Sequence, residues 1–200
     1  MHSAIKQFRS NIERVRALGG LYEALSQLTT SAVDATDILR AQIVLAVSAL
    51  DHYIHELTRL GMLEIFDGLR PSTNAFGRFQ VTMDAAMAGM VVSGGNAWFE
   101  SEIREKHGFL AFQHPDKVAD AIRLCSSCEL WLQVSIKLGL STQDVKNQLR
   151  LIVERRNKIA HEADLDPSYP GTRWPISSAD AGSTVQFIED ICEAIHSVIT

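Results

Sequence analysis

The chain has 200 residues, of which 46% are hydrophobic, with a formal net charge of −5 and a sequence pI of about 5.8. This length and composition predict one globular domain over residues 1–200 with a proper hydrophobic core. The acidic balance excludes a broad basic surface that coats nucleic acid non-specifically, but it leaves room for a local basic site.

Features of export and of disulfide-rich proteins are missing from the sequence. No apolar run reaches the roughly 18–20 residues that cross a bilayer, and the stretch MHSAIKQFRSNIERVR lacks the apolar core of a signal peptide. We therefore expect a soluble cytoplasmic protein that makes no membrane contact.

Three cysteines do not fit a secreted disulfide framework, and one Cys-x-x-Cys pair supplies only two of the four ligands of a structural zinc. We expect no metal and no cofactor, and the cysteines are expected to pack between helices.

Apolar residues at helical spacing predict helices through most of the first half of the chain. The first covers residues 3–28, with Gly19-Gly20 as a point where the helix could break. The longest covers residues 33–66. Residues 68–83 are rich in Gly, Pro, Ser and Asn and predict a loop. Two more helices are expected at 96–106 and 115–125.

The second half of the chain has clearer boundaries. A short apolar helix is expected to end near Gly139, and Ser141 with Asp144 predicts an N-terminal cap for a helix over 142–162. A proline-rich loop follows at 164–175, and a last helix covers about 180–199. These elements predict an all-α fold, a helical bundle with an irregular, partly helical insert at about 68–130.

The stretch RLIVERRNKIAHEAD, residues 150–164, places charge on the apolar line of a predicted helix. Arg156 follows Ile152 by four residues and precedes Ile159 by three. Asn157 and His161 are four apart and so neighbours on one face. Arg156 and His161 are five apart, about 140° around a helix, so the spacing permits a shared site without requiring one.

These residue types suit phosphoryl chemistry on RNA. The planar guanidinium of Arg156 matches phosphate oxygens, and His161 can take or give a proton at neutral pH. Asn157 can orient either of them. Together they could activate a 2′-hydroxyl, protonate a leaving oxygen and stabilise the charged transition state without a metal ion.

The run RNKIAH resembles the hallmark of the HEPN family (higher eukaryotes and prokaryotes nucleotide-binding). That motif is an Arg, usually followed by a polar residue, with four to six residues before a His near the end of a late helix in an all-α bundle. Arg156, Asn157 and His161 match it, and the chain is similar to stand-alone bacterial members of the family.

This resemblance implies a metal-independent endoribonuclease that forms a homodimer with two Arg–His pairs in one cleft. It implies an RNA substrate, 2′,3′-cyclic phosphate ends, a toxin or phage-defence context, and an antitoxin or defence-system partner protein. The catalytic residues would be Arg156, Asn157 and His161.

Two further sets of residues belong to this hypothesis. SALDHYIHEL, residues 48–57, lies on the long early helix, where family members often face the active helix with an acidic or polar residue. Asp51 is therefore expected to be the partner of Arg156, because a guanidinium buried alone is costly. Between residues 144 and 158, five basic residues stand against two acidic ones. Because this stretch has a local excess of positive charge, we expect Arg150, Arg155 and Lys158 to bind the phosphates of the RNA backbone.

Two alternatives stay open at the level of sequence. One is a non-catalytic dimeric module of the same fold that binds RNA or a partner protein. The other is an all-α adaptor in which Arg156 makes a structural ion pair and His161 interacts with the dipole at a helix C-terminus.

Overall fold

The computed structural model describes residues 1–30, 33–91 and 95–200. Within these ranges the regular structure consists of eight α-helices and one short 3-10 helix, without a β-strand. An isolated antiparallel bridge joins Leu165 to Arg173. The predicted all-α fold is thus confirmed. No described helix combines the length and the apolar character that a bilayer span requires.

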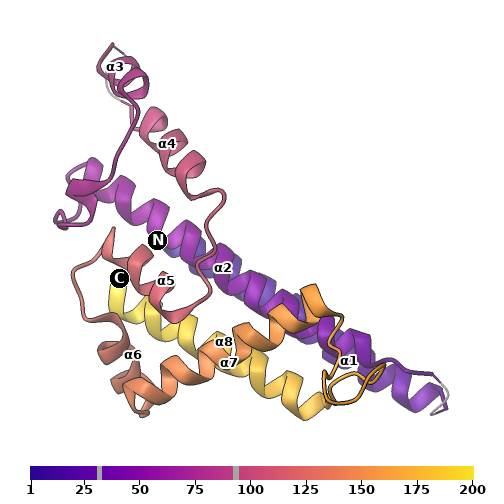
Figure 1. Ribbon diagram of the computed structural model, residues 1–200. Coiled ribbons are helices and arrows are strands. Elements are labelled where there is room, and N and C mark those ends of the chain that lie inside the picture. The colour runs from indigo at the N-terminus through magenta and orange to yellow at the C-terminus, as the bar shows by residue number, and fades with distance from the viewer. Residues whose placement is uncertain (31–32, 92–94) are drawn as a thin grey trace.

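Two long helices lie side by side along the bundle. α1 (His2–Leu28) runs along α2 (Thr36–Phe66), which has 31 residues and is the longest helix of the described chain (Figure 1). α1 continues through Gly19-Gly20 without a break. α8 (Ser178–Ile199) packs against both. Their apolar stripes meet in the main core, where Phe8 and Tyr53 are among the largest fully buried side chains.

α6 (Leu130–Leu138) packs against α8, and α7 (Thr142–Glu162) packs against α6 and α2 (Figure 1). α6 ends at Gly139, whose φ of 66° is left-handed and favours glycine. The side chain of Ser141 then accepts a hydrogen bond from the backbone N–H of Asp144, which starts α7 where the sequence predicted it.

The region 68–130 is partly helical, as expected. Its described residues form η1 (Phe76–Arg78), α3 (Met83–Val91), α4 (Ala97–His107) and α5 (Pro115–Arg123). α4 packs on the C-terminal part of α2 through a second small core around Met62 and Phe99. From α4 the chain runs back along α2 before α5 begins (Figure 1). This return brings residues 108–114 towards the helix that carries the Arg–His motif.

Candidate functional site

Arg156 is held by two neutral side chains. Its Nη1 donates to Oδ1 of Asn157 at 2.9 Å, and its Nη2 donates to Oε1 of Gln113. Within the described ranges, no carboxylate lies within salt-bridge distance of this half-buried guanidinium. Arg156 is therefore fixed in position while its positive charge stays uncompensated by a neighbouring anion.

Gln113 links Arg156 to Asp51. Only 7% of Gln113 is exposed, and its Nε2 donates to Oδ2 of Asp51 at 3.1 Å. The other carboxylate oxygen of Asp51 accepts the backbone N–H of Phe112 at 2.6 Å. Asp51 thus reaches Arg156 through one amide, rather than through the direct pair that the sequence suggested. Gln113 escaped the sequence analysis because it lies in an irregular segment, and no motif marks it.

His55 fixes the same segment one turn further along α2. Its Nε2 lies 3.2 Å from the carbonyl oxygen of Leu110 and 3.8 Å from Oδ1 of Asp51. Its ring centroid is 4.4 Å from that of Phe112. Together Asp51 and His55 attach residues 110–113 to α2, so the position of Gln113 follows from this attachment.

His161 stands apart from this network. It lies in the last turn of α7, its side chain is exposed, and it makes no hydrogen bond or ion pair with the residues described. Because it follows Arg156 by five residues, it points about 140° away around the helix, while Arg156 is turned towards Gln113. One copy of the chain therefore brings Arg156, Asn157, Gln113 and Asp51 together, and it leaves His161 outside that cluster.

The end of α7 is clamped by a buried carboxylate. Asp164 is 0% exposed, and its Oδ2 accepts from Nε of Arg40 at 2.7 Å and from Nη2 of Arg155 at 2.9 Å. Ala163 and Asp164 both have left-handed backbones, with φ of 52° and 59°, which turns the chain sharply after α7. Arg155 also donates to the backbone carbonyl of Pro175 at 3.2 Å. The predicted RNA contact Arg155 is therefore an anchor between α7, α2 and the following loop.

The other predicted backbone-binding residues also have partners on the protein. Nη1 of Arg150 lies 2.7 Å from Oε1 of Glu154, and both side chains are largely exposed. The amine of Lys158 lies 5.2 Å from the ring centroid of Trp174, a cation–π contact. Among the three arginines of this stretch, only Arg156 lacks a carboxylate partner within the part of the chain that the structure describes.

Cysteine and metal-ligating residues form no second site in the described chain. Cys125 and Cys192 are buried, Cys128 is partly buried, and all three are free thiols. Burial raises the pKa of the Cys125 thiol to about 12, so it is protonated at neutral pH. No group of three or more His, Cys, Asp or Glu side chains is arranged to hold a metal ion in residues 1–30, 33–91 and 95–200.

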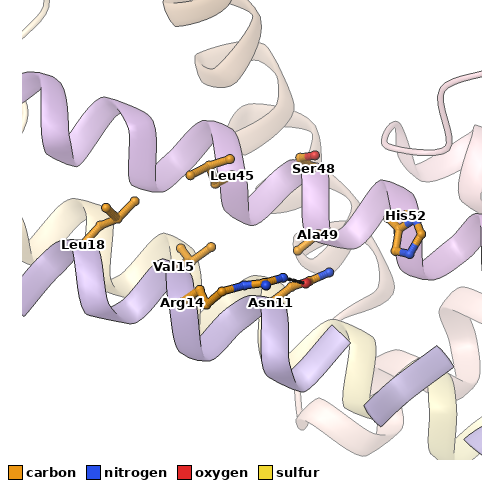
Figure 2. Close-up of a pocket in the computed structure, with 8 residues that line it drawn as sticks. All are labelled: Asn11, Arg14, Val15, Leu18, Leu45, Ser48, Ala49 and His52. Atoms are coloured by element: carbon orange, nitrogen blue, oxygen red, sulfur yellow. Dashed lines mark hydrogen bonds between the residues drawn. The ribbon is translucent and has the colours of Figure 1, made fainter. Parts of the chain in front are cut away.

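Two grooves flank the middle of α2. The larger, about 570 Å³, lies between α1 and α2. Figure 2 shows Val15, Leu18 and Leu45 at its apolar end and Arg14 with His52 at the other. The smaller, about 280 Å³, lies between α2 and α4 and also contains His52. His52 lines both grooves, and His55, which lies 3.8 Å from Asp51, lines the smaller one.

Comparison of the chain with protein-family models, with curated proteins and with solved structures gave no significant match.

Proposed function

We propose that the chain is a metal-independent endoribonuclease of HEPN type that acts as a homodimer. Its reaction is the attack of an RNA 2′-hydroxyl oxygen on the adjacent phosphorus. The O2′–P bond forms, the P–O5′ bond breaks, and the products carry a 2′,3′-cyclic phosphate and a 5′-hydroxyl. We place this activity in the cytoplasm, in a toxin or phage-defence context with an antitoxin or other defence protein as partner.

The observation that carries this proposal is the environment of Arg156. Its guanidinium is fixed by the amides of Gln113 and Asn157, and its neighbours Arg150 and Arg155 are neutralised by carboxylates. A positioned arginine without a carboxylate partner is suited to bind a phosphate and to stabilise the charge that develops on it in the transition state.

His161 would move the protons of this reaction. It must take the proton of the 2′-hydroxyl or give one to the departing 5′-oxygen, and an imidazole side chain is able to do either. Because His161 points away from Arg156 within one copy, we assign the complete site to two copies that face each other across the end of α7. Two His161 side chains would then supply the base and the acid.

A non-catalytic module that binds RNA is the second candidate. The observation that favours it is the separation of His161 from the Arg156 cluster within one chain. In that case Arg156 would still hold a phosphate, and His161 would have no role in a reaction.

RNA cleavage by purified protein in EDTA tests the proposal. The wild type is compared with His161→Ala and Arg156→Ala, and the product ends are mapped. We expect cleavage in EDTA with cyclic phosphate ends, and a loss of at least about 100-fold in each variant. Lys117→Ala, an exposed basic residue on α5, is the matched control and should cleave normally.

Three results would contradict the proposal. The first is a wild type that forms folded dimers but cleaves no RNA pool. The second is cleavage that disappears in EDTA. The third is cleavage that persists in His161→Ala at the wild-type rate. If the wild type does not cleave but binds RNA, and Arg156→Ala weakens that binding, the binding module is the better description.

A further inference from the structure

The smaller groove beside α2 has the chemistry of a site for a flat, uncharged ring. It lies between α2 and α4 and has a volume of about 280 Å³, which is small for a ligand pocket. It is lined by three histidines, two arginines, a glutamate, an isoleucine and a glycine: His52, His55, His107, Arg59, Arg104, Glu56, Ile103 and Gly108.

The charged groups at this groove already neutralise one another. Arg59 donates to Glu56 at 2.6 Å and to Glu100 at 3.0 Å. Arg104 reaches the same two carboxylates, at 3.4 Å and 3.0 Å. Burial, with a smaller effect of the neighbouring His55, lowers the pKa of His107 to about 4, so this ring is neutral at physiological pH. A groove with balanced charges favours a neutral ligand over a phosphate.

The side chains around the groove also offer flat surfaces and polar edges. The imidazoles of His55 and His107 are 6.4 Å apart between centroids, and Phe112 packs against both, which fixes their planes. The side chain of Arg104 is 54% exposed. Imidazole and guanidinium planes are the surfaces on which proteins stack unpaired RNA bases.

The groove is connected to Arg156 by a short series of contacts. His55 in the groove lies 3.8 Å from Asp51, and Asp51 binds Gln113 at 3.1 Å. Gln113 in turn accepts the hydrogen bond from Arg156. The groove and the guanidinium of Arg156 are therefore joined through two side chains, Asp51 and Gln113. A nucleotide needs sites for its base and its phosphate that are close to each other.

We infer that this groove binds one nucleobase of the RNA whose phosphate is held by Arg156, and that it gives the enzyme its base preference. The inference rests on the proposed function for the identity of the RNA substrate. The groove supplies stacking surfaces from His52, His55 and Arg104, and Glu56 can accept a hydrogen bond from an exocyclic amine of the base.

Titration with nucleosides tests the site without any need for cleavage. Adenosine, guanosine, cytidine and uridine carry no phosphate, and histidine ring protons are followed by NMR. We expect at least one nucleoside to shift the signals of His52 and His55 in a saturable way at millimolar concentration. Arg104→Ala should weaken the binding of that nucleoside by about fivefold or more, because a stacking surface is lost. Arg14→Ala, in the groove of Figure 2, is the control and should bind as the wild type does.

Cleavage mapping then separates this inference from the proposed function. In Arg104→Ala we expect the base preference next to the cleaved bond to flatten, because the base loses a stacking surface. Saturable nucleoside binding by a protein that never cleaves would support the groove and contradict the nuclease. Absence of nucleoside shifts, or an unchanged base preference in Arg104→Ala, would overturn the inference and leave the nuclease standing.

Discussion

Arg156 donates a hydrogen bond to the side-chain oxygen of Gln113, 43 residues earlier in the chain. The amide of Gln113 gives its nitrogen to Asp51, so only its oxygen can face the guanidinium. A neutral acceptor thus stands between the carboxylate of Asp51 and the arginine. Because Gln113 stands between the two charged groups, Arg156 is held in place and its charge stays available for an anionic ligand.

Gln113→Glu should therefore weaken RNA binding. The new carboxylate would pair directly with Arg156 and compete with phosphate, and it would also face the carboxylate of Asp51. We expect RNA affinity at neutral pH to fall by about tenfold or more, measured by fluorescence anisotropy with labelled RNA. Gln133→Glu makes the same chemical change at an exposed position of α6 and should bind within about twofold of the wild type. Equal affinities for the two variants would disprove the role of the neutral amide.

Two adjacent arginines should respond in opposite ways to alanine substitution. Arg155 pairs with the buried Asp164, so Arg155→Ala should lower the free energy of unfolding by about 1–3 kcal/mol. Arg156 has neutral partners, so Arg156→Ala should change stability little but reduce the slope of log affinity against log salt by about one unit. Urea unfolding and RNA binding at several salt concentrations measure the two effects. A salt slope that falls in Arg155→Ala and not in Arg156→Ala would reverse the assignment.

Much of the fold could be predicted because each helix carries its own signals. Apolar residues at three- and four-residue spacing marked α1, α2 and α8, and the cap at Ser141 marked the start of α7. In the region after α2, α4 and α5 were predicted, but α3, which packs on α4, was not. The return of the chain along α2, which places Gln113, is a tertiary contact that no local pattern encodes.

The sequence placed Arg156, Asn157 and His161 on one helix and Asp51 on an earlier one. It did not reveal that Gln113 stands between Asp51 and Arg156, or that His161 lies outside their cluster within one chain. No local pattern marked Asp164, which the structure buries completely between Arg40 and Arg155. Its burial depends on a left-handed turn at Ala163 and on Arg40 of α2, 124 residues earlier in the chain.

Asp164→Asn should destabilise the protein substantially. The substitution keeps the shape of the side chain but removes the charge that Arg40 and Arg155 share, and Arg40 is nearly fully buried. Breaking a buried ion pair on one side leaves an uncompensated charge, so we expect a loss of about 3 kcal/mol in the free energy of unfolding.

Denaturation in urea measures this loss, with Asp120→Asn as the matched control. Asp120 pairs with Arg123 on the surface of α5, where both side chains are more than half exposed. That pair should contribute less than about 1 kcal/mol. Losses of similar size for the two variants would show that Asp164 does not clamp the end of α7.

Acidification should lower the free energy of unfolding, because His107 is buried in its neutral form. Its pKa is about 4 in the folded protein, against about 6.5 in an unfolded chain, because burial disfavours the charged ring. Between these values the unfolded state binds a proton that the folded state does not, so stability is complete above pH 6.5 and falls as the pH drops towards 4. His107→Leu should lose less stability than the wild type between pH 7 and pH 4.5, measured by urea midpoints. His114→Leu removes a histidine whose side chain is 45% exposed, and it should keep the wild-type pH dependence. Parallel pH profiles for the wild type and His107→Leu would contradict the prediction.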